Sequence, residues 1–216
     1  MVYSVIIPTM WQVGSFPSFL SKLEAVDLIR EIIIIDNAIK QRPKEVKETS
    51  KIKIIPQISN IGVNPAWNLG ANLATSNYLC ILNDDIEFDL SVFSYLVNQI
   101  DSSCGMIGID LKDKSNKLTL ETLTERPFGF GCLFFMLKDN YQKIPSRLIY
   151  YYGDDWLFTI SSLTKKTNKL LKGISPRGYV SATSHKINNN VATSLAEKSI
   201  YLTELRSFVA LSNKND

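Results

Sequence analysis

Short continuous runs of apolar residues alternate with helical periodicity along the first half of the chain. Such runs predict strands that are covered on both faces, as in a parallel sheet. Between the runs, apolar residues recur every three or four positions, which indicates helices. The alternation predicts an α/β fold with a mainly parallel sheet. The predicted strands are 2–7, 31–35, 52–55 and 78–82, and the predicted helices begin near Ser15, Asn64 and Asp89.

The second half of the chain has a less regular pattern. Residues 106–109 and 131–137 are apolar and predict two further strands. By contrast, 112–127 is a polar excursion, and 164–172 is interpreted as a lysine-rich connection.

The last quarter of the chain predicts one more helix. Ser194 and Glu197 have the spacing of a capping box, in which each side chain bonds a backbone N–H near the other. Apolar residues follow them at helical spacing. No internal repeat, low-complexity tract or linker divides the sequence, so we expect a single domain over 1–216.

Length and composition are those of an ordinary globular chain, with 216 residues, 45% hydrophobic and 21% charged. The formal net charge of +3 is too small to indicate a nucleic-acid partner, and none is expected. No apolar run approaches the ~20 residues that span a bilayer. The first eight residues lack the basic region of a signal peptide. We therefore expect a soluble, cytoplasmic protein without a transmembrane segment.

The three cysteines carry no sign of a metal site. Cys80, Cys104 and Cys132 stand far apart without metal-type spacing, and two of them lie in apolar, strand-like runs. Buried free thiols in a reducing compartment are the expected state.

Two aspartates follow directly after the fourth predicted strand. Asn83, Asp84 and Asp85 come at the carboxyl end of 78–82, and such strand ends border the ligand crevice in open α/β sheets. Adjacent carboxylates repel each other and are stabilised by a hard divalent cation with oxygen ligands. The pattern predicts a metal ion that these aspartates bind and that also coordinates a diphosphate. The alternative is a loop whose acidic side chains are solvated.

Five short motifs resemble the family 2 glycosyltransferases of the GT-A fold. The motifs are V-I-I-P-T at 5–9, I-I-I-I-D-N at 32–37, N-I-G-V-N-P-A-W-N-L-G at 60–70, L-N-D-D at 82–85 and G-D-D-W at 153–156. They occur in the family's order over most of 2–160. The resemblance implies a single-domain, Rossmann-like fold with a central, mostly parallel mixed sheet flanked by helices. Its nucleotide-sugar-binding half would cover about 1–100 and its acceptor-binding half about 101–216.

The resemblance also implies a nucleotide pocket. The ends of the first two strands would form the floor under the base and ribose, and an acidic residue there would contact the uracil or the ribose. Glycine in the next motif allows close backbone approach, and asparagine amides can both donate and accept. Turn and capping chemistry is the alternative for these residues. The matching positions are Pro8, Thr9, Asp36, Asn60, Gly62 and Asn68.

The metal motif of the family, D-x-D, matches Asn83-Asp84-Asp85 with asparagine in the first position. By this match Asp85 is the first expected ligand of Mn2+ or Mg2+ and Asp84 the second. Asn83 and Asp84 would also border the nucleotide sugar. The single histidine, His185, matches a late metal ligand of many GT-A enzymes; a structural or exposed histidine is the alternative.

The acidic pair before Trp156 matches the family's catalytic acids. An inverting transferase needs a carboxylate that takes the proton of the attacking hydroxyl. Aligned on the tryptophan, Asp155 fits this general base and Asp154 fits its acidic neighbour. The alternative is a helix N-cap followed by a first-turn acid.

Together these matches predict the transfer of a sugar from a nucleotide sugar, most simply a UDP-sugar, to a hydroxyl acceptor with inversion. The acceptor would be a glycan, a glycoprotein or a lipid-linked sugar, and a bacterial or viral glycan pathway would suit the chain. A sugar-phosphate nucleotidylyltransferase is a rival, but its glycine-rich, arginine-containing loop is absent after Ile7. A module that binds a nucleotide sugar or glycan without turnover is a second rival, which Asn83 favours and the acidic pair disfavours.

Overall fold

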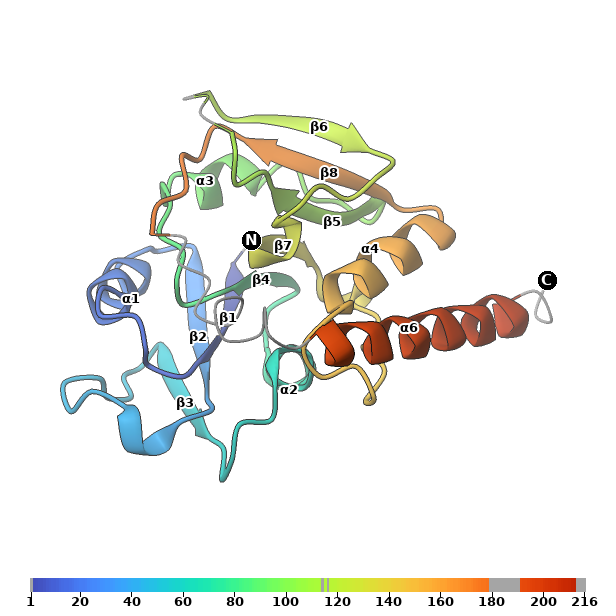
Figure 1. The fold of residues 1–216 in the computed structure, drawn as a ribbon. Coiled ribbons are helices and arrows are strands. Elements are labelled where there is room, and N and C mark those ends of the chain that lie inside the picture. Colours follow the sequence, from blue (N-terminus) through green and yellow to red (C-terminus); the bar gives the residue numbers. More distant parts are fainter. Residues whose placement is uncertain (1, 114, 116, 179–190, 213–216) are drawn as a thin grey trace.

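The computed structural model describes residues 2–113, 115, 117–178 and 191–212. The strands are β1 (Tyr3–Thr9), β2 (Ile29–Asp36), β3 (Ile52–Pro56), β4 (Tyr78–Leu82), β5 (Cys104–Ile109), β6 (Thr119–Leu123), β7 (Leu133–Leu137) and β8 (Thr167–Lys172). They form one eight-stranded sheet in the order β3-β2-β1-β4-β7-β5-β8-β6 (Figure 1). β6 and β7 run antiparallel to their neighbours, and all other pairs are parallel. The predicted α/β fold with a mostly parallel mixed sheet is confirmed, whereas its division into two halves stays a prediction.

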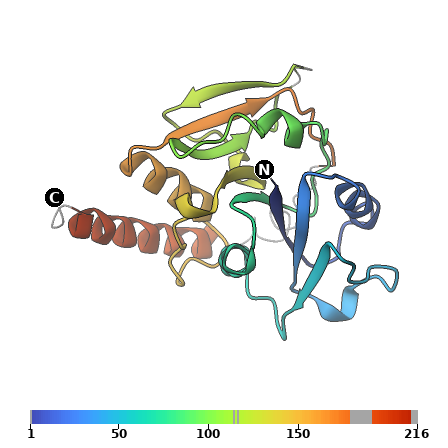
Figure 2. The same ribbon diagram turned by 180° about the vertical axis from the view of Figure 1, so that it is seen from behind.

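Helices cover both faces of the sheet (Figures 1 and 2). One buried cluster joins α1 and α3 to one face, and a second joins α2 and α4 to the other, with α6 beside α4. In the described ranges, no helix combines the length and the apolar character needed to cross a membrane. The helices are α1 (Phe16–Glu24), α2 (Val63–Leu73), α3 (Val92–Leu96), α4 (Gly153–Leu163) and α6 (Val191–Ser212), with short 3-10 turns η1 (Ile39–Gln41), η2 (Phe130–Cys132) and η3 (Lys138–Asn140).

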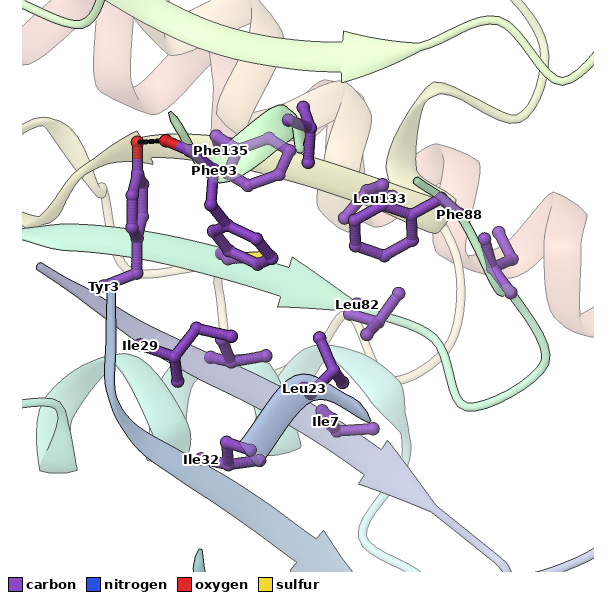
Figure 3. Packing of buried hydrophobic residues seen from close by; sticks show 14 of the residues in the cluster. Tyr3, Ile7, Leu23, Ile29, Ile32, Leu82, Phe88, Phe93, Leu133 and Phe135 are labelled. Carbon is purple, nitrogen blue, oxygen red and sulfur yellow. Dashed lines mark hydrogen bonds between the residues drawn. The ribbon is translucent and has the colours of Figure 1, made fainter. Parts of the chain in front are cut away.

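The apolar runs of β1 and β2 supply both clusters, because successive side chains of a strand point to opposite faces. Ile7 packs toward α1, and its neighbour Ile6 packs toward α2. Aromatic packing of Tyr3 anchors the start of β1 (Figure 3). Its ring centroid lies 5.2 Å from that of Phe93 and 6.0 Å from that of Phe135. These contacts lie at the end of β1 opposite to Thr9.

Two strands form where the sequence predicted none. β6 lies inside the polar excursion 112–127, and β8 lies inside the lysine-rich connection 164–172, so those two interpretations were wrong. Pairing explains both strands, because β8 joins β5 and β6 covers the outer edge of β8. Hydrogen bonding of the backbone to a neighbouring strand does not require an apolar sequence. Lys172 and Glu121, paired at 2.7 Å, belong to this edge.

Candidate active site

The carboxyl ends of β1, β2 and β4 meet at one edge of the sheet. Thr9 lies opposite Asp36 in the parallel register of β1 and β2, and Pro8 precedes it, half-buried. The hydroxyl of Thr9 donates a hydrogen bond to Asp84 Oδ2 at 2.5 Å. The structure therefore brings together residues that three separate motifs contribute.

Asp36 is fully buried, yet one of its oxygens has no hydrogen bond. Its Oδ1 accepts from the Trp11 indole N–H at 2.8 Å and from the Ala38 N–H at 3.1 Å. Among the described residues, Oδ2 has no hydrogen-bond partner, and the Arg42 guanidinium lies 3.9 Å away, at ion-pair distance only. A buried carboxylate oxygen in this state can accept a hydrogen bond from a ligand N–H or O–H. Trp11 was not predicted as a site residue, because nothing around it in the sequence distinguishes it from a core tryptophan.

The two aspartates of the metal motif are both partly desolvated. Burial raises the pKa of Asp84, although the Thr9 hydroxyl and the Met10 N–H oppose the rise. Burial and then the charge of Asp84 raise the pKa of Asp85 to about 6. Asp85 Oδ1 is buried and has no hydrogen-bond partner in the described part of the chain. A divalent cation would relieve both the repulsion and the missing partner.

These two carboxylates fit a divalent metal that shares its ligands with a substrate. Within the described residues, no three His, Cys, Asp or Glu side chains gather closely enough to form a metal site by themselves. Asp84 and Asp85 supply hard oxygen donors, and the oxygens of a diphosphate would complete the coordination. The predicted third ligand, His185, lies outside the described residues.

The segment after β3 lies beside these strand ends. Its Ile61 N–H donates to Asn37 Oδ1 at 3.3 Å, and Asn60 Oδ1 accepts from the Gly62 N–H at 2.8 Å. Gly62 has a φ of 88°, and a Cβ at this position would overlap Ile149. Glycine is therefore required here both by the backbone conformation and by close packing.

Asn68 is not brought to this edge in the same way, because its amide group is engaged elsewhere. Its Nδ2 donates to the Ile144 carbonyl at 2.8 Å, and its Oδ1 accepts from the Ile144 N–H at 2.9 Å and the Tyr141 hydroxyl at 3.0 Å. These bonds fasten α2 to the segment after η3. The place in the nucleotide pocket that the resemblance implied for Asn68 stays a prediction.

The acidic pair lies in the first turn of α4 and forms a fork with Arg126. Arg126 Nη1 lies 2.7 Å from Asp154 Oδ2, and its Nε lies 2.9 Å from Asp155 Oδ1. The residue that precedes the helix, Tyr152, has a φ of 61° and makes no side-chain cap. Burial raises the pKa of Asp154, the Arg126 charge lowers it, and the charge of Asp155 raises it. The alternative of a simple N-cap is therefore incomplete, because both acids have a cationic partner.

The turn η2 connects the metal motif to the acidic pair. The Asn83 N–H donates to the Cys132 carbonyl at 2.9 Å, and a Cβ on Gly131 would lie 2.6 Å from Asp154 Cβ. Burial, followed by the charges of Asp85 and Asp154, raises the pKa of the Cys132 thiol to about 12. One acid of each pair, Asp85 and Asp154, thus affects this side chain, and η2 contacts both motifs.

The final helix fastens the loop before the acidic pair. The carboxylate of Glu197 is 4% exposed and accepts hydrogen bonds from the N–H groups of Ile149, Tyr150 and Tyr151 at 2.9–3.2 Å. The predicted capping box with Ser194 was wrong, since α6 already begins at Val191 and the carboxylate reaches another segment. Three successive N–H groups can neutralise a buried anion without a cation.

A family model described as Glycosyl transferase family 2 matches residues 4–165. The chain belongs to this family, and the class predicted from its motifs, a glycosyltransferase of the GT-A fold, is confirmed. The search of curated proteins found no match.

Solved glycosyltransferase structures share the fold at low sequence identity. S. aureus TarS 1–349 is 16% identical with a TM-score of 0.56, over 80% of this chain and 58% of that chain. GalNAc-T7 with UDP, GalNAc and Mn2+ is 12% identical with a TM-score of 0.61, over 81% and 42%. The mannosyltransferase PcManGT from Pyrobaculum calidifontis, in complex with GDP-Man and Mn2+, is 12% identical with a TM-score of 0.57, over 85% and 59%. The chain thus spans roughly half the length of these proteins, and the similarity shows the fold alone.

Proposed function

We propose that this protein transfers a sugar from a nucleotide sugar, specifically a UDP-sugar, to a hydroxyl group of a glycan, glycoprotein or lipid-linked acceptor. The observation that carries the proposal is that η2 contacts both acidic motifs, through the bond from the Asn83 N–H to the Cys132 carbonyl and through the close packing of Gly131 against Asp154. Glycosyl transfer needs anion stabilisation at the departing diphosphate and a base at the attacking hydroxyl. This edge of the sheet offers groups for both tasks.

On the donor side, Asp36 would bind the nucleoside. Its free Oδ2 would accept from the uracil N–H or a ribose hydroxyl, above a floor formed by Pro8 and Thr9. Asn60 and Gly62 would border the ribose, and Asn83 and Asp84 would lie near the sugar and diphosphate. TarS has been solved in complex with UDP-GlcNAc, which supports a uridine nucleotide, whereas PcManGT holds GDP-Man.

Asp85, assisted by Asp84, would hold Mn2+ or Mg2+, and His185 remains a proposed further ligand. When bound, such a cation supplies positive charge against the charge that develops on the departing diphosphate. The free, buried Oδ1 of Asp85 supports this assignment, and the Mn2+ present in two of the related structures agrees with it.

On the acceptor side, Asp155 would act as general base and Asp154 as its neighbour. The acceptor oxygen forms its bond to the anomeric carbon, the bond to the diphosphate oxygen breaks, and the hydroxyl proton passes to the Asp155 carboxylate. Attack opposite the leaving group inverts the anomeric centre, which is the outcome that the family resemblance implies. Holding the two reacting atoms in line would supply part of the rate.

Two measurements test the proposal. Calorimetry with UDP-sugars should show metal-dependent binding in the wild type and in Asp27→Ala, an exposed control, but not in Asp85→Ala. Equal donor affinity with and without Mn2+ in the wild type would contradict the proposed metal binding. Tighter binding of GDP or dTDP than of UDP would contradict the assignment of a uridine nucleotide.

A turnover assay distinguishes the proposed transferase from a non-catalytic binding module and from a nucleotidylyltransferase. Adding glycan acceptors to the protein with UDP-sugar and Mn2+ should release UDP, which chromatography detects. Donor binding with no acceptor-dependent UDP release would favour the non-catalytic module. Release of pyrophosphate from UTP and a sugar phosphate would favour the nucleotidylyltransferase.

A further inference from the structure

Arg126 holds one oxygen of each catalytic candidate. It lies in the connection between β6 and η2, and its Nη1 and Nε bind Asp154 Oδ2 and Asp155 Oδ1 at 2.7 and 2.9 Å. The side chains of Arg126, Asp154 and Asp155 are 25%, 20% and 29% exposed, so the fork is largely shielded from solvent. Nη1 also donates to the Pro127 carbonyl at 3.4 Å, which steadies the guanidinium.

The fork leaves a specific oxygen of Asp155 available. Oδ1 accepts from Nε, and no described residue forms a hydrogen bond with Oδ2. A guanidinium is planar and holds its donors at fixed angles, so its bonds to the two acids fix where Asp155 Oδ1 lies relative to Asp154. Arg126 thereby limits the positions that the free Oδ2 can take.

We propose that Arg126 is a positioning residue that pairs with both acids and directs the free Oδ2 of Asp155 toward the acceptor hydroxyl. This inference rests on the proposed glycosyl transfer. It assigns a role to a residue of the loop before η2, which the family motifs of this sequence do not include.

Charge gives the second part of the role. Two adjacent carboxylates that lack a cation tend to share one proton, and a protonated base cannot accept the acceptor proton. Among the described residues, Cys132 of η2 and Tyr201 of α6 also interact electrostatically with the pair, and burial, first among the causes, raises the pKa of each. Both are therefore neutral near pH 7. In the described part of the chain no cation besides Arg126 pairs with either acid.

The charge of Arg126 also determines the direction in which its removal should shift the pH dependence of turnover. The positive charge of Arg126 lowers the pKa of Asp154, so its removal allows the acidic pair to take up a proton at higher pH. Activity is lost as the pair takes up that proton. In Arg126→Gln the acidic limb of the kcat profile should therefore move to higher pH, by about one unit, the order of shift that a nearby opposite charge causes.

The experiment compares Arg126→Gln and Arg126→Lys with Arg147→Gln, a control at an exposed arginine outside the site. UDP release is followed from pH 5 to 9 with saturating donor and Mn2+, and donor affinity is measured by calorimetry. Arg126→Gln should lower kcat at pH 7 by about 10- to 100-fold, less than the full worth of a general base. Arg126→Lys should keep the acidic limb but not the full rate, because one ammonium cannot bridge both acids. Donor affinity should change less than about twofold, since Arg126 contacts neither metal motif nor nucleotide residues.

An unmoved acidic limb in a folded Arg126→Gln variant would overturn the positioning role, and a parallel loss of donor affinity would place Arg126 on the diphosphate instead. Carboxyl NMR titration of Asp154 in the wild type and in Arg126→Gln adds a readout that needs no turnover. Asp154 should take up its proton at higher pH in the variant, because the Arg126 charge lowers its pKa, and an unchanged titration would contradict the inference. If the wild type releases no UDP with any acceptor while the Asp154 titration moves in the variant, the proposed function fails and the electrostatic role of Arg126 stands.

Discussion

The hydrogen bonds of the Glu197 carboxylate to the N–H groups of 149–151 allow a direct test of how the fold supports the acidic pair. Its Oε2 accepts from all three N–H groups of 149–151, and its Oε1 shares the Tyr150 N–H. In Glu197→Gln the amide carbonyl can replace only one oxygen, the charge is lost, and an NH2 group faces the Tyr150 donor. Bonds to a charged acceptor are worth roughly 1.5–3 kcal/mol and neutral ones about 1. Weakening three such bonds should cost about 2 kcal/mol, and Glu197→Ala, which removes all three, should cost about 5 kcal/mol.

The consequence should reach the acidic pair, because 149–151 leads directly into Tyr152 and the first turn of α4. Urea unfolding measures the free energy, and hydrogen exchange reports the amides of 149–151 separately. Glu204→Gln on the same helix is the control, since the Glu204 carboxylate accepts no hydrogen bond from any residue in the described ranges. The reasoning is refuted if Glu197→Gln unfolds within about 0.5 kcal/mol of the wild type and the three amides exchange at unchanged rates.

Three further predictions concern other parts of the molecule. Hydrogen bonds from Lys53, Ser4 and Thr75 lower the pKa of Glu31 to about 2, although burial opposes this shift. The stability that these bonds add is present above pH ~4.5 and should be lost as the pH falls toward 2. Acid unfolding of Glu31→Gln should lack this part of the slope, and an identical slope would contradict the assignment. Asp155→Asn should lower turnover by about two to four orders of magnitude with little change in donor binding. Asp154→Asn should lower turnover less, and a larger loss in Asp154→Asn than in Asp155→Asn would mean that the two roles are exchanged. Gly62→Ala should weaken donor binding and lower the melting temperature, because a Cβ there meets Ile149 at a φ of 88°; unchanged values in both assays would show that the loop adapts freely.

The sequence alone contained enough to predict the architecture. Continuous apolar runs such as 32–35 and 78–82 can be buried only between two layers, so they specify strands of a covered sheet. Polar residues that directly follow such strands must lie at the sheet's carboxyl edge. Asp36, Asp84 and Asp85 could therefore be assigned to one site without coordinates, and the structure brings Asp84 to the end of β1 through Thr9.

Other features were decided by the tertiary structure. β6 and β8 form through pairing between segments that are about fifty residues apart, and their own composition does not predict strands. Arg126 is separated from its carboxylates by 28 and 29 residues, and Glu197 from its N–H partners by 46 to 48. Local patterns carry information about periodicity and capping over a few residues only. A partner for a buried charge is chosen by what the folded chain brings within about 3 Å of it, and that distance exists only after the sheet and its helices have packed.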